Sequence, residues 1–371
     1  MKFTADKQSL MAAINIVSRA CAPKSPIPSL EGILIEAGIA NVRLTGYDLK
    51  KGIYTTIDAD VAEPGSIVLG AKIFGDIIRS LPNGDVTIKT GEGQNTTITS
   101  EKSEFSIVGT DFNDYPELPS IDGSVGVDIP QDMMGEMIRE TIFSVSDNEA
   151  RPVYTGEYFE IQDGILTLVA VDGYRLALRR EKIEGAEHDC TFIVPGKSLS
   201  DLEKLCASDS AEPVKILLGS KHISFSIGRT VLISRRLDGD FLNYHKAVPT
   251  EFNIKINTER GAFQRAIERV SLIIDDKVKN PIRCIFGDGS VSISCSTSVG
   301  KAEDSFSVDG DGKNLEVGFN NRYMLEALKA APADDMVVCL NTGSSPCVMV
   351  PADEEDRSFL YMVLPVRLKA D

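Results

Sequence analysis

Apolar residues recur at helical spacing in six segments of the chain. In the first segment Leu10, Ile14 and Val17 are four and three residues apart, and five later segments show the same spacing. The pattern predicts helices over residues 7–20, 71–82, 131–146, 196–208, 258–275 and 320–331. The first helix of each pair starts again after 124 and then 127 residues, and the second after 125 and then 124. This near-constant interval predicts three copies of one two-helix unit.

Segments of alternating apolar and polar residues repeat in step with the helices. Residues 33–49, 157–176 and 283–299 follow the first helix of each unit, and residues 86–107, 214–237 and 336–366 follow the second. The strands come in groups between the helices, which indicates an α+β fold with antiparallel sheets. Prolines at 116–119 and at 249 mark the connections. We therefore expect three domains, at residues 1–120, 121–249 and 250–371.

The charge of the chain excludes a protein that binds nucleic acid over its whole surface. The 371 residues include 39 Lys and Arg against 55 Asp and Glu, a net charge of −16. The six predicted helices carry twelve basic and ten acidic residues, whereas the rest of the chain carries 27 and 45. Helices tolerate Lys and Arg well, which is one interpretation of this contrast. The interpretation that we favour is a shared helical face that meets a polyanion, with an acidic exterior around it.

Neither a membrane anchor nor a disulfide framework is expected. Polar residues interrupt every long apolar run, and Asp6 lies where a signal peptide would need an apolar core. The seven cysteines form no C-x-x-C pair, and most lie inside apolar runs. Reduced, buried thiols and a cytoplasmic location are the simplest interpretation.

The chain lacks the residue patterns of a catalytic site. His188, His222 and His245 lie in separate segments, and no nucleophile elbow or phosphate-binding glycine loop is present. We therefore expect no enzymatic activity, no cofactor and no metal. An enzyme that uses Asp275 and Asp276 as an acid/base pair remains an alternative, and it would require a deep cleft around these carboxylates.

Eight short segments distributed over the whole chain resemble one protein family. They are Met1-Lys-Phe-Thr, Leu44-Thr-Gly-Tyr-Asp-Leu, Asp114-Tyr-Pro-Glu-Leu-Pro, Arg151-Pro-Val-Tyr-Thr-Gly-Glu-Tyr-Phe-Glu, Val171-Asp-Gly-Tyr-Arg-Leu-Ala, Asp238-Gly-Asp-Phe-Leu-Asn-Tyr, Gly318-Phe-Asn-Asn-Arg-Tyr-Met-Leu and Tyr361-Met-Val-Leu-Pro-Val-Arg-Leu. Each segment is a weak signal alone, but their common order makes the combination specific. The chain resembles the bacterial DNA polymerase III beta subunit, the sliding clamp that serves as a processivity factor in DNA replication.

The resemblance implies three tandem DNA-clamp domains, each with two helices packed on antiparallel sheets. Two such chains would close head to tail as a homodimeric ring that encircles duplex DNA without reading its sequence. The implied partners are the replicative polymerase, an ATP-dependent clamp loader, and other replication and repair proteins with a clamp-binding peptide. A monomeric peptide-binding scaffold of the same fold remains the alternative.

The resemblance also implies a pocket for the partner's peptide. Its residues here would be Tyr154, Val171, Gly173, Tyr174, Arg175, Leu176, Leu242, Lys246, Ala247, Ser345, Met362, Val363, Leu364, Pro365, Val366 and Arg367. Three features depart from the family pattern. Tyr174 replaces a common histidine, Leu242 replaces a common proline, and Lys369-Ala370-Asp371 extends the tail. The preferred peptide is therefore expected to differ from that of relatives.

Two further surfaces follow from the resemblance alone. Positions that match the family's DNA-facing cations are Lys24, Lys72, Arg79, Arg151 and Lys197. The dimer contact would join the first domain to the third domain of the partner, through Ile73, Phe74, Lys102, Phe105 and Ile107 on one side and Leu272, Ile273 and Glu303 on the other.

Overall fold

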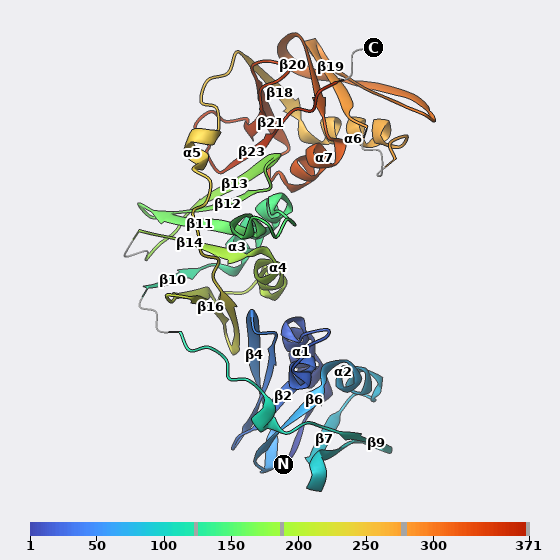
Figure 1. The fold of residues 1–371 in the computed structure, drawn as a ribbon, viewed down its shortest axis with the longest axis vertical. Helices are drawn as coiled ribbons and strands as arrows, with labels where there is room; N and C mark the ends of the chain where they lie inside the picture. Colours follow the sequence, from blue (N-terminus) through green and yellow to red (C-terminus); the bar gives the residue numbers. More distant parts are fainter. Residues whose placement is uncertain (122–124, 186–188, 276–279, 369–371) are drawn as a thin grey trace. The chain divides into compact units, whose positions relative to one another are not determined.

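The computed structural model describes residues 1–121, 125–185, 189–275 and 280–368 (Figure 1). Within these limits the chain forms two compact units. The first unit comprises Met1–Met134 and Asp201–Arg236, and the second comprises Gly135–Ser200 and Leu237–Asp371. The middle repeat thus contributes to both units, so the compact units do not coincide with the three predicted domains.

All six predicted helices are present, and most end a few residues earlier than predicted. They are α1 (Lys7–Val17), α2 (Ala71–Ser80), α3 (Gln131–Thr141), α4 (Gly196–Leu205), α6 (Arg260–Ser271) and α7 (Asn321–Ala330). After α1 and α3 the chain tightens into 3₁₀ turns, at Ser18–Ala20 and Ile142–Ser144, which accounts for part of the difference. A short helix, α5 (Tyr244–Ala247), was not predicted, because one turn is too short to show helical periodicity.

The apolar residues whose spacing predicted the helices are buried in the structure. Leu10, Ile14 and Val17 of α1 are fully buried, and the Asp6 carboxylate caps the helix by accepting a bond of 2.9 Å from the Ser9 amide. Across the described residues, no helix combines the length and the apolar content that a bilayer crossing requires.

The first unit contains two antiparallel sheets. A five-stranded sheet has the order β5-β1-β7-β8-β9, and an eight-stranded sheet has the order β10-β15-β16-β17-β4-β3-β2-β6. Their strands are β1 (Lys2–Asp6), β2 (Gly32–Ala37), β3 (Asn41–Tyr47), β4 (Lys51–Asp58), β5 (Asp60–Glu63), β6 (Gly65–Gly70), β7 (Asp85–Thr90), β8 (Asn95–Ser100), β9 (Ser103–Val108), β10 (Val125–Ile129), β15 (Val214–Leu218), β16 (His222–Ile227) and β17 (Thr230–Arg235).

The second unit contains one ten-stranded sheet of order β14-β11-β12-β13-β23-β22-β21-β18-β20-β19. Its strands are β11 (Gly156–Gln162), β12 (Ile165–Val171), β13 (Arg175–Lys182), β14 (Cys190–Pro195), β18 (Ile254–Glu259), β19 (Ile282–Thr297), β20 (Gly300–Phe319), β21 (Asp335–Leu340), β22 (Cys347–Pro351) and β23 (Phe359–Val363). The register of β19 against β20 shifts on either side of Asp288. The buried face of this sheet packs on α6 and α7 around Phe263, Ile267 and Met324.

Strand pairing joins successive repeats in the same way twice. In the first joint, β4 of the first repeat pairs with β17 of the second, and Gly52 lies opposite Ile233. In the second joint, β13 of the second repeat pairs with β23 of the third, and Leu176 lies opposite Met362. Each joint lies within one compact unit. The second joint carries the residues considered next.

Candidate functional site

An apolar cluster at the second joint brings together residues that are distant in the sequence. Its buried members are Val169, Val171, Leu176, Leu178, Tyr244, Val337, Cys339, Val348 and Met362. Half-buried residues pack around them: Tyr154, Tyr158, Phe241, Leu242, Val248, Phe252, Val350 and Leu360. Five residues of the predicted peptide pocket belong to this cluster. Strands β12, β13, β21, β22 and β23 supply its base, and the segment 237–248 supplies part of the half-buried rim.

A tight turn between β12 and β13 forms one edge of the cluster. The Asp172 carboxylate accepts bonds from the amides of Tyr174, at 2.8 Å, and Arg175, at 3.1 Å. Gly173 has a φ of 93°, which a side-chain-bearing residue adopts only with strain. The turn leaves the Tyr174 ring 62% exposed, stacked on Tyr323 with ring centroids 6.1 Å apart. An aromatic surface therefore lies beside the apolar cluster.

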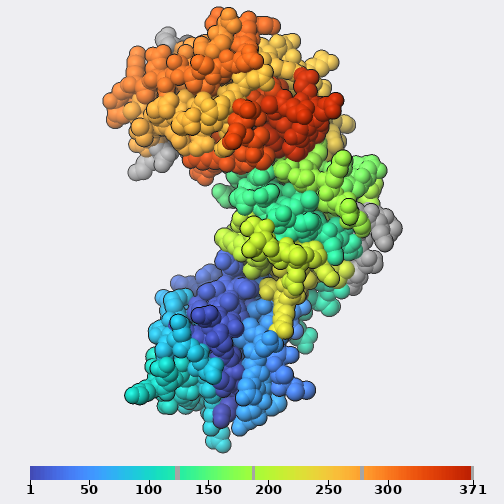
Figure 2. Space-filling model, turned by 180° about the vertical axis from the view of Figure 1, so that it is seen from behind, coloured from blue at the N-terminus to red at the C-terminus, as the bar shows by residue number. Residues whose placement is uncertain are grey.

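The tail of the chain continues from β23 along this turn. The Leu364 amide donates to the Tyr174 carbonyl oxygen at 2.8 Å, and the Val366 amide donates to the Gly318 carbonyl oxygen at 2.8 Å. Leu364 and Pro365 are half-buried, whereas Val366 and Arg367 are exposed. In the space-filling view, red atoms of the C-terminal segment lie on the surface of the second unit (Figure 2). The extension Lys369-Ala370-Asp371 lies outside the described residues.

The segment 237–248 is held in place by aromatic packing. Phe241 stacks on Tyr158, with centroids 5.1 Å apart, and meets Tyr154 edge-on at 5.6 Å. Tyr244 is buried and donates its hydroxyl hydrogen to the Glu160 carboxylate, and burial together with this carboxylate raises the pKa of Tyr244. Lys246 is exposed and Ala247 is half-buried. The sequence motif Asp238–Tyr244 contained Phe241, but the predicted pocket did not include it.

Two predicted pocket residues do not present their side chains at this surface. The Arg175 side chain is only 7% exposed: its Nε donates to Asp172 at 2.9 Å, and its other nitrogens donate to Glu326 and to the Phe143 carbonyl oxygen. Val363 is 1% exposed and belongs to the core of the third repeat. Strand alternation turns both side chains to the face of the sheet opposite to that of Leu176 and Met362. Ser345 is half-buried, and its hydroxyl lies 2.7 Å from that of Thr342.

The arrangement is suited to binding an apolar segment of another molecule. Half-buried apolar side chains around an exposed tyrosine can desolvate apolar groups of a peptide, and the exposed backbone of the turn can orient it. Among the described residues, no group of three or more His, Cys, Asp and Glu side chains is placed to hold a metal ion. Asp276 and His188 lie outside the described residues, so the structure does not describe the proposed pair of Asp275 and Asp276.

The five cations of the predicted DNA-facing set are all exposed. Arg79 pairs with Asp76 on its own helix at 2.8 Å, whereas the ion pairs between described residues include none for Lys24, Lys72 or Lys197. The cations of α6 and α7 differ: Arg265, Arg269, Arg322 and Lys329 all pair with carboxylates. Among the described residues, these four cations of α6 and α7 are therefore neutralised by carboxylates, whereas Lys24, Lys72 and Lys197 are not.

The two predicted contact edges lie in different units. On the first, β9 is the last strand of its sheet, with Lys102 beside it exposed, Ile107 half-buried, and Phe105 and Val108 37% and 76% exposed. Val108 was not predicted, and it falls outside the alternation of Phe105 and Ile107 along β9. Ile73 on α2 is exposed.

Phe74, also predicted for this edge, differs from its neighbour Ile73. Its side chain is fully buried in the core of the first repeat. On the other predicted edge, Leu272 is 84% exposed, Ile273 is half-buried against the core of the third repeat, and Glu303 is exposed on β20. Each unit therefore exposes apolar side chains: Ile73, Phe105 and Val108 on the first and Leu272 on the second.

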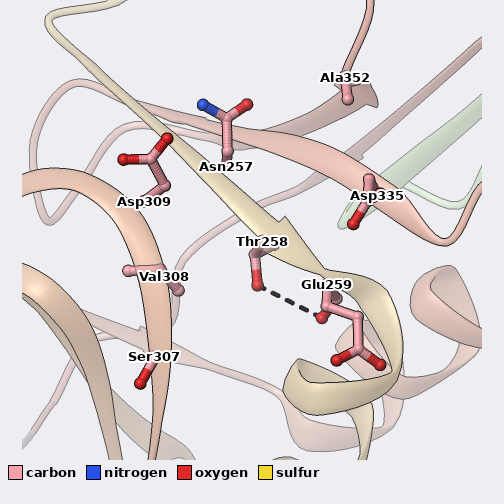
Figure 3. A pocket seen from close by; sticks show the side chains of 8 residues that line it. All are labelled: Asn257, Thr258, Glu259, Ser307, Val308, Asp309, Asp335 and Ala352. Atoms are coloured by element: carbon pink, nitrogen blue, oxygen red, sulfur yellow. Dashed lines mark hydrogen bonds between the residues drawn. The ribbon is translucent and has the colours of Figure 1, made fainter.

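The third repeat also has a hollow with a largely polar lining (Figure 3). It has a volume of about 450 Å³ and is lined by Asn257, Thr258, Glu259, Ser307, Val308, Asp309, Asp335 and Ala352. It opens where β18 and β20, paired at Asn257 and Asp309, diverge. Three carboxylates and one large apolar side chain make this lining a poor match for an apolar peptide, so we do not assign it to partner binding.

Models of one family match the chain in three consecutive sections. The N-terminal domain of the DNA polymerase III beta subunit matches residues 1–119, the central domain matches residues 128–243, and the C-terminal domain matches residues 245–367. The beta sliding clamp of Staphylococcus epidermidis is 34% identical over 377 aligned positions, which cover 99% of both chains. That of Staphylococcus aureus is 33% identical with the same coverage.

Solved structures agree with these matches. The DNA polymerase sliding clamp of Bacillus subtilis has a TM-score of 0.95 and 31% identity, with all of both chains covered. A putative DNA polymerase III beta subunit from Eubacterium rectale has a TM-score of 0.94 and 30% identity, covering 99% of this chain and 100% of that chain. The three tandem two-helix repeats, the antiparallel sheets and these matches agree along the whole length. The chain belongs to the DNA polymerase III beta subunit family, the beta sliding clamps.

Proposed function

We propose that two copies of the chain close head to tail into a ring around duplex DNA. The ring tethers the replicative polymerase, and the apolar cluster at the second joint binds a peptide of the polymerase and of other replication and repair proteins. The protein itself has no catalytic activity, and an ATP-dependent loader opens the ring. The three domains correspond to residues 1–120, 121–249 and 250–371.

The apolar cluster at the second joint is the observation that carries the tethering role. Leu242 is a half-buried member of this cluster, and the half-buried Leu364 donates its amide to the carbonyl oxygen of the exposed Tyr174, so a bound peptide would remove both leucines from water. Burial of apolar side chains stabilises a complex by roughly 25 cal/mol per Å² before the costs of association. The polar groups of the turn at Asp172 can orient the bound peptide.

Two features support ring closure. The terminal strand β9 exposes Phe105 and Val108, and the loop after α6 exposes Leu272. Exposed strand edges with apolar side chains favour association with another chain. The family match adds weight, since the relatives named above are sliding clamps.

The charge distribution supports encirclement rather than tight binding of DNA. With a net charge of −16, the chain cannot rely on a phosphate-neutralising surface to stay on DNA at physiological salt. A few exposed cations, such as Lys72 and Lys197, suffice to make the lining of a ring weakly attractive. Retention then comes from topology, and the contacts carry no sequence information.

Light scattering coupled to size exclusion tests ring closure. We expect a mass twice that of the 40.3 kDa protomer at micromolar concentration. A mass near one protomer would support the alternative of a monomeric peptide-binding scaffold and would reject the ring.

Retention on DNA tests encirclement independently. The protein, loaded onto nicked circular DNA by a clamp loader and ATP, should remain bound after gel filtration and should be lost once the circle is cut. Equal retention on circular and linear DNA would contradict the proposal, because a ring must slide off a free end.

A further inference from the structure

Arg175 connects three separate segments of the second unit: its own turn, helix α7 and the 3₁₀ turn after α3. Its guanidinium donates to the Asp172 carboxylate, to the Glu326 carboxylate on α7 and to the Phe143 carbonyl oxygen after α3. The same group lies over the Tyr323 ring, 4.5 Å from its centroid. With 7% of its side chain exposed, Arg175 touches little solvent and leaves little surface for a ligand.

Two of these contacts fix parts of the candidate site. Asp172 closes the turn that presents Tyr174, and Tyr323 is the ring on which Tyr174 stacks. The Tyr174 carbonyl oxygen in turn accepts the Leu364 amide. Successive contacts therefore connect the buried Arg175 to the exposed Tyr174 and to Leu364 in the tail.

Glu326 is held in its ionised form by this arrangement. Partial burial opposes ionisation, but hydrogen bonds from Arg322, at 2.7 Å, and from Arg175 outweigh it and lower the pKa of Glu326. The pair of Arg175 and Glu326 is therefore charged at neutral pH. A planar guanidinium with several donors can satisfy both carboxylates and the carbonyl oxygen together, which a lysine cannot do.

We propose that Arg175 is a positioning residue for partner binding. Its guanidinium holds the 172–175 turn against α7 and thereby fixes Tyr174 and Leu364 at the rim of the apolar cluster. The inference rests on the proposed peptide-binding function and adds that the shape of the site depends on a buried cation that the peptide does not touch.

The first joint provides a matched control for a purely structural role. Lys51 occupies the position 124 residues before Arg175, and it pairs with Asp201 on α4 as Arg175 pairs with Glu326 on α7. Lys51 is 12% exposed, and Asp48 caps the preceding turn with two bonds of 2.8 Å. A substitution here removes an equivalent buried ion pair in the first unit, away from the apolar cluster.

Calorimetry with a polymerase-derived peptide that bears glutamine and leucine tests the inference on the full-length protein. We expect Arg175→Met to weaken binding about tenfold, equivalent to about 1.4 kcal/mol. Arg175→Lys should fall between the parent protein and Arg175→Met, because it retains the charge but not the fork of donors. Lys51→Met should lower the melting temperature yet leave the affinity within twofold of the parent.

Amide hydrogen exchange gives a second measurement. A purely structural role of Arg175 would not change the exchange rate of the Leu364 amide selectively. Exchange at the Leu364 amide should accelerate in Arg175→Met, while amides of β22 should keep their protection. If Arg175→Met proves too unstable to measure, Glu326→Gln removes the charge pair while Arg175 remains, and it should also weaken binding.

The outcomes separate the two proposals. Peptide binding by the parent protein with unchanged affinity in Arg175→Met and Glu326→Gln would overturn the positioning role and leave the proposed function standing. Equal loss of affinity in Lys51→Met would also overturn it, because the effect would then follow general stability. An absence of peptide binding by the parent protein would overturn the proposed tethering role, and the positioning role with it.

Discussion

The first and second joints share one backbone design but differ in the side chains that cover it. In both, a capped turn leads into a strand that pairs with the last strand of the next repeat, and a buried cation pairs with a helix of that repeat. Gly52 in the first joint corresponds to Leu176 in the second, 124 residues later. Leu118 packs against Gly52 so closely that a Cβ there would overlap its Cδ2.

The difference shows how a repeated architecture can carry a single binding site. At the first joint the chain's own connecting segment, through Leu118, covers the strand at Gly52. At the second joint Leu176 fills the equivalent position, and the following segment leaves Leu242 half-buried in the same apolar cluster. Duplication therefore supplied the scaffold, and local substitutions decided which joint kept an open apolar surface.

The largest effect is expected at Gly46, which precedes the first joint. A Cβ at Gly46 would overlap the carbonyl oxygen of Val17 at the end of α1, and backbone cannot move aside as a flexible side chain can. Gly46→Ala should therefore lower the free energy of unfolding by about 2 kcal/mol or more, measured by urea denaturation.

The equivalent position in the second repeat serves as the control. Ala170 is fully buried on β12, and Ala170→Gly should cost only about 1 kcal/mol. A Gly46→Ala variant as stable as the parent would show that the end of α1 is not closely packed on β3.

Leu364→Ala tests whether the open surface belongs to the second joint alone. Because Leu364 is half-buried beside Tyr174, its truncation should weaken binding of the glutamine-and-leucine peptide by over ~1 kcal/mol in calorimetry. Leu118→Ala, at the first joint, should leave the affinity unchanged. Unchanged affinity in Leu364→Ala would count against the assigned site.

A double-mutant cycle sharpens the contrast between Gly52 and Leu176. Gly52→Ala should destabilise the protein by about 1 kcal/mol, because the Leu118 side chain must move away. Leu118→Ala should remove most of that penalty, so the two substitutions should not be additive in urea denaturation. Additive costs would mean that Leu118 does not cover Gly52 in solution.

The smallest expected effect concerns a buried acid of the second repeat. Glu157 is fully buried on β11, where the other repeats have the buried Ile33 and Ile282. Burial raises the pKa of Glu157 well above its usual value of 4.5, although a bond of 3.1 Å from the Thr141 hydroxyl opposes the shift. The folded state therefore holds a proton that the unfolded chain releases.

The pH dependence of this residue follows from its pKa. Its contribution to stability is complete below pH 4.5 and falls as the pH rises through the elevated folded-state pKa. Glu157→Gln cannot ionise, so its stability relative to the parent should increase between pH 5 and pH 8 in urea titrations at several pH values. A constant difference over that range would show that Glu157 does not titrate differently on folding.

Much of the fold could be predicted from residue spacing. The six helices were confirmed, because each needs only a local apolar stripe of the kind formed by Leu10, Ile14 and Val17. The ends of the helices were less accurate, since a 3₁₀ turn such as Ser18–Ala20 continues the same stripe with tighter geometry. The pairing of β13 with β23 joins residues far apart in the chain, and spacing carries no signal for it.

The sequence predicted which residues belong to the candidate site more accurately than how their side chains are oriented. Motif residues such as Leu176, Leu242 and Met362 do share one apolar cluster, while Tyr323 and Phe241, which pack on neighbouring rings, were not included. Arg175 and Val363 were expected at the surface because they stand in the same motifs. Motif membership does not report the direction of a side chain, which depends on the sheet that receives it.

By itself, the sequence determined the threefold repeat, the order of helices and strands, and the acidic charge of the chain, because these depend on local spacing and composition. Tertiary structure alone decided which apolar residues stay accessible. Ile73 is exposed while its neighbour Phe74 is buried, and Tyr174 is exposed while its neighbour Arg175 is buried. The physical reason is that burial is set by partners from distant segments, and those partners meet only in the folded chain.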